Sequence, residues 1–167
     1  LVEALQAQGL NIPVFAYYPS LAGMPTALAG SEERLPVYQV ASHHSNQEGP
    51  VAALATAFRQ QHGEDFVVYA SYDGLQMLGR AMADARSTDA LLVAARLSGL
   101  SFQGFNGPVL MRADDHQLQK GVYISRWQKA SARYPRGAEA TAYTFAPVQY
   151  IDGARLGGTP RCGLPRS

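Results

Sequence analysis

Two short apolar runs on either side of a helix-forming segment constrain the fold of this 167-residue chain. The first run covers residues 12–18 and ends at Pro19, and the second covers residues 35–40. Short, continuously apolar segments are typical of parallel strands that are buried on both faces. Residues 21–29 between them favour a short helix that stops at Gly30. The sequence therefore predicts an α/β fold with parallel strands.

Three further helices are predicted in the middle of the chain, where apolar residues recur at the helical period. Pro50 suits the first turn of one helix, which stops at Gly63. A shorter helix from residue 90 is capped by Ser87 or Thr88 with Asp89. Between them lies a longer helix, whose expected buried stripe comprises Val68, Tyr72, Leu75, Leu78, Gly79 and Met82.

Strands are expected again in the last third of the chain. Residues 107–112 and 121–127 alternate apolar and polar side chains, so we expect a hairpin closed by a turn over residues 113–120. Residues 141–151 are expected to add an irregular strand. From residue 153 onward Gly, Pro and Arg dominate, which favours an extended tail.

Composition excludes several classes of protein. Apolar residues make up 47% of the chain and charged residues 16%, which is typical of globular proteins and not of disordered ones. The net charge is +1 and the arginines are scattered, whereas nucleic-acid binders need a basic stripe that displaces counterions from phosphates. No nucleic-acid partner is therefore expected. No run reaches the ~18 apolar residues of a membrane span. The chain opens within a helix and without a methionine, so we expect a signal peptide to lie upstream or to have been removed.

The motifs of common enzymes and metal sites are not found in the sequence. No serine lies in a Gly-x-Ser-x-Gly turn, and no glycine-rich segment joins a strand to a helix as a phosphate loop requires. His43 and His44 are adjacent, and neighbouring side chains on an extended chain point to opposite sides. Asp114 and Asp115, beside His116, suit the backbone groups of a turn better than calcium. We therefore expect no enzyme, metal or cofactor.

Tyr17 and Tyr18 form the most informative polar pair, because they lie where the first strand ends. In open α/β sheets, ligands bind at the carboxyl ends of the strands. A phenol offers both an aromatic face and a hydrogen-bonding hydroxyl. We expect Tyr18 to face a ligand; the alternative is that at least one of the two tyrosines belongs to the core.

Four local patterns, in order and at matching spacing, resemble the carboxy-terminal part of the leucine/isoleucine/valine-binding proteins of ABC importers. They are residues 14–20 with Ala29-Gly30, residues 71–76 (Ser-Tyr-Asp-Gly-Leu-Gln), residues 105–109 (Phe-Asn-Gly-Pro-Val), and Asp115-His116 before residues 121–123. The similarity spans residues 1–128. It implies a Rossmann-like type I periplasmic binding fold, in which two lobes joined by three chain crossings close over a ligand.

The resemblance also implies an organisation for this chain, which would hold only part of the first lobe and need the missing amino-terminal portion of the protein. The expected segments are second-lobe strands and helices (1–40), an interlobe crossing (41–49), first-lobe helices (50–104), a hinge and second-lobe hairpin (105–128), and an extended carboxy-terminal tail (129–167).

The resemblance further implies a binding site. Relatives that bind aliphatic amino acids have an acidic side chain at the position of Tyr18, and it pairs with the ligand ammonium. A phenol has a pKa of about 10 and cannot neutralise an ammonium at neutral pH. We therefore expect a ligand other than a simple α-amino acid, such as an aromatic or other carboxylate, or an amide. Tyr17 and Ser20 are further expected contacts, and Phe66 would form an apolar wall.

The implied function is that of an extracytoplasmic, periplasmic binding protein that delivers a small solute to the membrane permease of an ABC transporter. Two alternatives remain: a ligand-sensing domain of a signalling receptor, and an α/β enzyme whose catalytic residues lie outside this chain. Cys162 is either a free thiol or half of a disulfide whose partner is outside the chain. Some relatives have a cysteine near the carboxyl terminus, which implies the disulfide in an oxidising periplasm.

Overall fold

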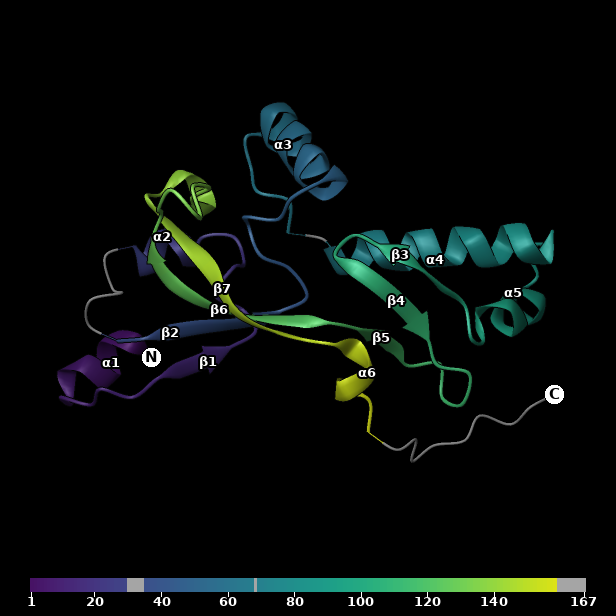
Figure 1. The fold of residues 1–167 in the computed structure, drawn as a ribbon, viewed down its shortest axis with the longest axis horizontal. Helices are drawn as coiled ribbons and strands as arrows, with labels where there is room; N and C mark the ends of the chain where they lie inside the picture. Colours follow the sequence, from purple (N-terminus) through teal and green to yellow (C-terminus); the bar gives the residue numbers. More distant parts are fainter. Residues whose placement is uncertain (30–34, 68, 159–167) are drawn as a thin grey trace. The chain divides into compact units, whose positions relative to one another are not determined.

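The structure, a computed structural model, describes residues 1–29, 35–67 and 69–158. Contacts divide the chain into two compact units. Unit 1 comprises Leu1–Val67 and Val122–Tyr150, and unit 2 comprises Val68–Gly121 and Ile151–Ser167. The chain therefore passes from one unit to the other three times, after residues 67, 121 and 150. Figure 1 follows this path along the sequence.

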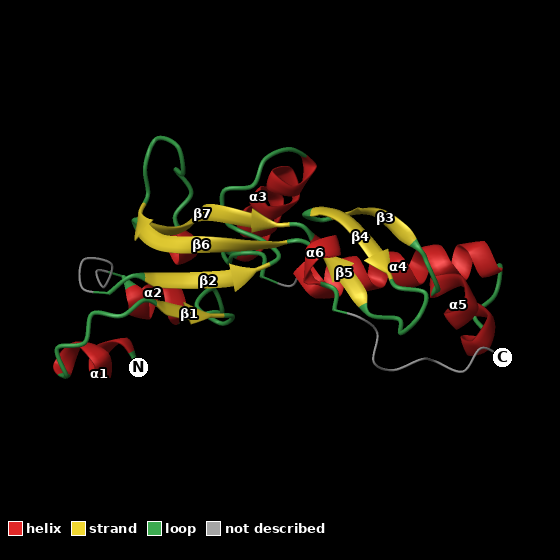
Figure 2. Cartoon of the chain, turned by 60° about the horizontal axis from the view of Figure 1, so that its bottom comes forward, coloured by secondary structure: helices red, strands yellow, loops and turns green. Residues whose placement is uncertain are grey.

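Unit 1 is built on a four-stranded mixed sheet, seen in Figure 2. Its strands, in spatial order, are β1 (Val14–Ala16), β2 (Val37–Ala41), β6 (Val122–Lys129) and β7 (Tyr143–Ile151). The parallel pairing predicted for the two apolar runs is confirmed, because β1 is parallel to β2, while β6 is antiparallel to β2. The expected burial of β1 on both faces is wrong. The strand lies at the sheet edge, and Phe15 is 57% exposed.

The core of unit 1 lies on one face of this sheet. The helices of unit 1 are α1 (Val2–Ala7), α2 (Met24–Leu28), α3 (Pro50–His62) and the 3-10 turn η1 (Ala138–Ala140). Leu28 of α2 packs with Val37, Trp127, Ala138 and Phe145. The indole Nε1 of Trp127 also donates to the carbonyl oxygen of Leu28 at 3.0 Å, so its polar atom is satisfied inside the apolar cluster.

Unit 2 combines three helices with a three-stranded antiparallel sheet. Its elements are α4 (Tyr69–Ala85), α5 (Ala90–Leu97), β3 (Ser101–Gly104), β4 (Gly107–Met111), β5 (Leu118–Lys120) and α6 (Gly153–Leu156). α4 and α5 pack against each other, and α4 contacts β3 (Figure 1). The predicted cap of α5 is confirmed, because Asp89 accepts from the backbone amides of Leu91 and Leu92.

The predicted hairpin between residues 107–112 and 121–127 is wrong. β4 pairs with β3 and β5, whereas β6 pairs with β2 in the other unit. The expected turn over residues 113–120 contains the short strand β5, which completes the sheet of unit 2. Both predicted strands exist, but alternation along a strand gives its faces and does not specify its partner. The segment expected to be an extended tail also contains the short helix α6.

The buried face of α4 also differs from the prediction. The helix buries Tyr69, Asp73, Met77 and Ala81, which are spaced four residues apart. Leu75, a member of the predicted stripe, is 71% exposed, and Leu78 is also exposed. Apolar periodicity selected the wrong stripe because the buried one includes a charged residue. Val68 lies outside the described residues.

The helices divide between the two units. α3 belongs by its contacts to unit 1, and α4 and α5 belong to unit 2, while the expected division into lobe segments stays a prediction. Which lobe of a two-lobe protein each unit represents stays a prediction. None of the helices in the described part of the chain is long and apolar enough to cross a membrane.

Candidate binding site at the carboxyl end of β1

The loop from β1 to α2, residues 17–23, begins at the carboxyl end of the parallel pair β1 and β2. Tyr17 is 72% exposed and Tyr18 is 67% exposed, so neither ring belongs to the core. Pro19, directly after them, is buried and fixes the loop to the body of unit 1. Both tyrosines are therefore accessible to a ligand at the edge of the sheet where α/β proteins bind ligands.

Ser20 is held by a hydrogen bond from a buried side-chain amide. The Nε2 group of Gln39 on β2 donates to Ser20 Oγ. The side chain of Gln39 is 1% exposed, and its neighbour in register on β6 is the fully buried Ser125. Ser20 could be predicted from its place after an apolar run, whereas Gln39 was missed because it lies within an otherwise apolar strand.

The other end of the loop is held by a carboxylate that comes from far away in the sequence. Glu139 accepts from the backbone amide of Gly23, from the backbone amide of Thr26 at 2.9 Å and from Thr26 Oγ1 at 2.7 Å. These groups belong to the start of α2, so Glu139 acts as its cap. Burial raises the pKa of Glu139, but the hydrogen bonds from Thr26 and Gly23 outweigh it and lower the pKa below its ordinary value.

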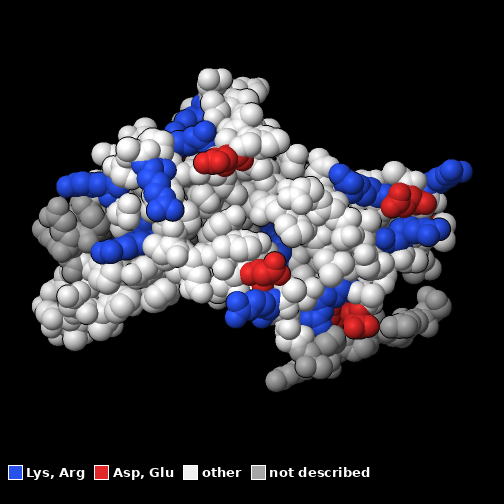
Figure 3. Space-filling model, viewed as in Figure 1, with Lys and Arg blue, Asp and Glu red and all other residues white. Residues whose placement is uncertain are grey.

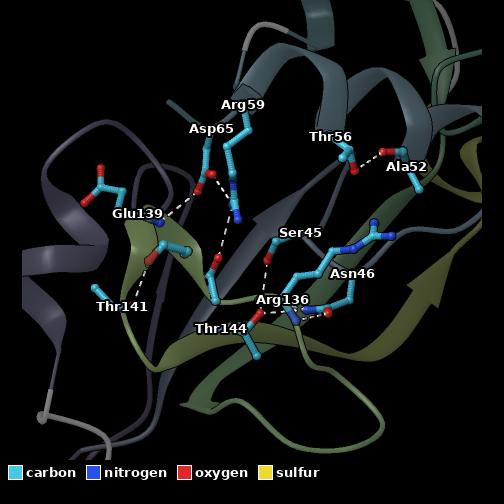
Figure 4. A network of polar contacts seen from close by, with 12 residues as sticks. Ser45, Asn46, Ala52, Thr56, Arg59, Asp65, Arg136, Glu139, Thr141 and Thr144 are labelled. Atoms are coloured by element: carbon cyan, nitrogen blue, oxygen red, sulfur yellow. Dashed lines mark hydrogen bonds and ion pairs between the residues drawn. The ribbon is translucent and has the colours of Figure 1, made fainter. Parts of the chain in front are cut away.

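A second carboxylate holds Glu139 in place, as Figure 4 shows. Asp65 Oδ2 accepts from the backbone amide of Glu139 at 2.8 Å, and Asp65 Oδ1 pairs with Arg59 of α3. Arg59 also donates to the carbonyl oxygen of Gly137 at 3.2 Å. Glu139 and Ala140 both have positive φ, 48° and 55°, which is costly for residues other than glycine. The polar network therefore stabilises a strained turn that presents the Glu139 carboxylate to α2.

The segment after β2 is also anchored by polar contacts. Ser45 Oγ lies 3.0 Å from the buried Thr144 Oγ1, and Asn46 Nδ2 donates to the same oxygen at 2.8 Å (Figure 4). Asn46 Oδ1 accepts from the backbone amide of Arg136 at 2.8 Å. This polar, aperiodic segment therefore has a defined path in unit 1.

An aromatic group lies at the same edge of the sheet, where β2 ends and β6 begins. The ring of His44 lies edge-on to Tyr123, with centroids 4.7 Å apart, and Tyr123 contacts Tyr150 of β7 at 4.9 Å. Burial lowers the pKa of His44 to about 4, so its imidazole is neutral at neutral pH. No local sequence pattern indicates this cluster, because its members come from three segments of the chain.

Phe66 is buried, and its ring meets Phe58 of α3 edge-on at 5.1 Å. It therefore packs in unit 1, and its expected role as a wall of the ligand pocket stays a prediction. Of the four predicted site residues, Ser20 hydrogen-bonds to Gln39 and Phe66 packs against Phe58. Tyr17 and Tyr18 share the loop of Ser20.

The acidic turn of unit 2 behaves as its residue types predict. Asp115 Oδ1 accepts from the backbone amide of Gln117 at 3.0 Å, and Asp115 Oδ2 pairs with Arg112 at 3.1 Å. The interpretation of this acidic residue as a turn former is confirmed. Within residues 1–29, 35–67 and 69–158, no group of three or more His, Cys, Asp and Glu side chains could hold a metal ion.

Unit 2 contains a buried ion pair that no sequence pattern indicates. Asp73 of α4 is 1% exposed. Its Oδ1 accepts from the backbone amide of Phe105 at 2.7 Å, and its Oδ2 lies 3.1 Å from Lys120 Nζ. Charged groups are spread over both units, and Figure 3 shows basic side chains in separate groups with acidic ones beside some of them.

Residues 1–132 match the family model described as periplasmic binding protein. The chain belongs to the periplasmic binding protein family. This match covers most of the chain and confirms the resemblance inferred from the four sequence patterns. A search of curated proteins finds no match.

Solved structures agree with the family at the level of the fold. The chain is similar to the leucine-, isoleucine-, valine-, threonine-, and alanine-binding protein from Brucella ovis, with a TM-score of 0.84 and 20% identity over 100% of this chain and 44% of that one. It is also similar to a solute binding protein of an ABC transporter from Rhodopseudomonas palustris BisB5, in complex with 3,4-dihydroxy benzoic acid, with a TM-score of 0.68 and 11% identity over 91% of this chain and 48% of that one.

A third match is a solute binding protein of an ABC transporter from Rhodopseudomonas palustris HaA2, in complex with p-hydroxybenzoic acid. It has a TM-score of 0.62 and 15% identity over 90% of this chain and 39% of that one. The chain thus spans less than half the length of these proteins. The predicted α/β fold of the type I periplasmic binding class is confirmed. Cys162 lies outside the described residues.

Proposed function

We propose that the protein is the extracytoplasmic, periplasmic substrate-binding component of an ABC importer. It captures a small organic solute between two lobes and delivers it to a membrane permease, without catalysing a reaction. The family match over residues 1–132 supports this function. The amino-terminal portion that the similar structures possess would supply the rest of the site, and Cys162 would form a disulfide with it.

The observation that carries the ligand class is the loop after β1. Tyr17 and Tyr18 are exposed there, and residues 17–23 contain no acidic side chain that could pair with an ammonium. Two phenols offer aromatic contact and hydroxyl groups, which suit an aromatic carboxylate or amide. Two similar solved structures are complexes with hydroxylated benzoic acids, which is consistent with this class. Ser20 and Phe66 would contribute a hydrogen bond and an apolar wall.

The test is isothermal titration calorimetry on the intact protein with 4-hydroxybenzoate, benzamide and leucine. We expect the aromatic ligands to bind and leucine to bind far more weakly. Tyr18→Ala should weaken binding of 4-hydroxybenzoate about tenfold through loss of ring contact and a hydrogen bond, and Tyr18→Phe should weaken it less.

Tyr134→Phe is the matched control. Tyr134 follows the carboxyl end of β6, which is antiparallel to β2, so it lies at the opposite end of the sheet from Tyr18. Its substitution should leave the dissociation constants unchanged. Micromolar or tighter leucine binding would contradict the proposed ligand class, and the binding of none of the three solutes would contradict the proposed function.

A further inference from the structure

The hydroxyl of Ser20 is bound by a buried residue, Gln39. Gln39 lies on β2 with its side chain 1% exposed, on the same face of the strand as the buried Val37. A buried amide is costly unless it is hydrogen-bonded, and an apolar side chain would fill this position at lower cost. The amide of Gln39 is instead bound to Ser20, a partly buried residue of the loop after β1.

The direction of this hydrogen bond leaves the serine proton available. A serine hydroxyl has one proton to donate and two lone pairs that accept. Gln39 Nε2 donates to Ser20 Oγ and thereby occupies one lone pair. Among the residues that the structure describes, Ser20 Oγ has no other hydrogen-bond partner, so its proton has no acceptor there.

Several neighbouring hydrogen-bond donors are already bound within the protein. Glu139 binds the backbone amides of Gly23 and Thr26 and the Thr26 hydroxyl. The backbone amide of Leu21 donates to the carbonyl oxygen of Tyr18 at 3.0 Å. The side-chain hydroxyls of Ser20, Tyr17 and Tyr18 are not among these bound groups, so they can meet a ligand.

We propose that Gln39 is a positioning residue that holds the Ser20 hydroxyl with its proton free, so that Ser20 donates to an oxygen acceptor of the ligand, above all a carboxylate. The inference rests on the proposed function and specifies the ligand group that Ser20 recognises. An ammonium would find only the one remaining lone pair of Ser20 Oγ and no carboxylate within residues 17–23 to neutralise its charge, which disfavours it.

The test compares 4-hydroxybenzoate with 4-hydroxybenzylamine, which differ in the sign of one group, by calorimetry on the intact protein. The unsubstituted protein should bind the acid and bind the amine far more weakly. Ser20→Ala should weaken binding of the acid about tenfold, the usual effect of losing a hydrogen bond to a charged group. Gln39→Met keeps the side-chain volume but removes the hydrogen bond to Ser20, so the serine hydroxyl can rotate. It should weaken binding of the acid by a smaller factor.

The two substitutions should not be additive if Gln39 acts through Ser20. The double variant should bind the acid no more weakly than Ser20→Ala alone. Gln39→Glu should reverse the polarity, because a carboxylate accepts the serine proton, and should move the acid-to-amine affinity ratio toward the amine. That variant buries a charge, so Gln39→Met carries the test if Gln39→Glu fails to fold.

Ser125→Ala is the control for disturbance of the buried layer. Ser125 pairs in register with Gln39, is fully buried, and its Oγ has no hydrogen-bond partner among the described residues. Its substitution should leave both dissociation constants unchanged. Melting temperatures of all variants separate loss of folding from loss of recognition.

Each outcome separates this inference from the proposed function. If Gln39→Met and Ser20→Ala leave the acid-to-amine ratio unchanged while the acid still binds, the inference is wrong and the solute-binding function stands. The same holds if the protein binds the amine and not the acid. If the protein binds neither probe nor any solute of the calorimetric panel, both are overturned.

Discussion

The two units use the same interaction, a carboxylate that accepts from backbone amides, in opposite surroundings. In unit 2, Asp73 is buried, binds the amide of Phe105 and pairs with Lys120. In unit 1, Glu139 is only partly buried and binds the start of α2. A buried charge that loses its partner is strongly destabilising, whereas an exposed one is solvated by water. We infer that Asp73 maintains the fold of unit 2, while Glu139 positions the loop that carries the candidate site.

The largest effect is expected from Asp73→Ala. It leaves Lys120, which is only 17% exposed at its side chain, without a counterion, and leaves the amide of Phe105 without its acceptor. Removing one partner of a buried pair costs about 3 kcal/mol or more. Urea denaturation of the intact protein measures the change, with Asp84→Ala on the same helix as the control. If the free energy of unfolding falls by less than about 1 kcal/mol, water compensates for the lost partner of Lys120, and the contrast between the two units is removed.

An intermediate effect is expected from Gly104→Ala, which tests how tightly unit 2 encloses the ion pair. A Cβ at this position would clash with Val109 Cγ2 and would also lie 2.9 Å from Asp73 Oδ1, closer than van der Waals contact allows. Overpacking of this kind typically costs about 1–3 kcal/mol. Gly79→Ala in α4 is the matched control, because its Cβ meets nothing within 4 Å and alanine favours the helix. The control should gain stability in the same urea experiment; equal effects at both positions would contradict close packing around Asp73.

The smallest effect is expected in unit 1 and depends on pH. The lowered pKa of Glu139 means that its stabilising contribution is complete above the ordinary value of 4.5 and is lost as pH falls through the lower folded-state value. The lowered pKa of His44 also makes the folded state less stable in acid. Between pH 6.5 and about 4, His44 binds a proton in the unfolded chain but not in the folded chain. The free energy of unfolding therefore decreases as the pH is lowered across that range.

Variants separate these two pH windows. Glu139→Gln should remove the loss below pH 4.5 and speed amide exchange at Thr26, at a cost of about 1 kcal/mol at neutral pH, as for other helix caps. His44→Asn should flatten the range from pH 6.5 to 4 and leave the lower range intact. Thermal melts from pH 3 to pH 8 measure both. Identical profiles for the variants and the unsubstituted protein would show that neither group sets the acid response of unit 1.

Local signals predicted the elements well and their partners poorly. Pro50, Gly63 and Asp89 mark helix ends through their own backbone geometry or hydrogen bonds, and the structure has helix ends at these residues. The partner of β6 was wrong, because pairing depends on which distant strand completes a sheet. The buried stripe of α4 was wrong for a related reason: Asp73 reads as polar in sequence but is satisfied by Lys120, 47 residues away.

The candidate site divides in the same way. Tyr17, Tyr18 and Ser20 could be predicted because they directly follow an apolar strand, and chain order alone puts them at its carboxyl end. Gln39, Glu139 and His44 could not be predicted, since each acquires its role from a contact with another segment. The sequence by itself determined the family, the α/β class and the place of the loop. Only the tertiary structure decided which buried groups hold that loop, because burial and hydrogen bonding between distant residues exist only after the chain has folded.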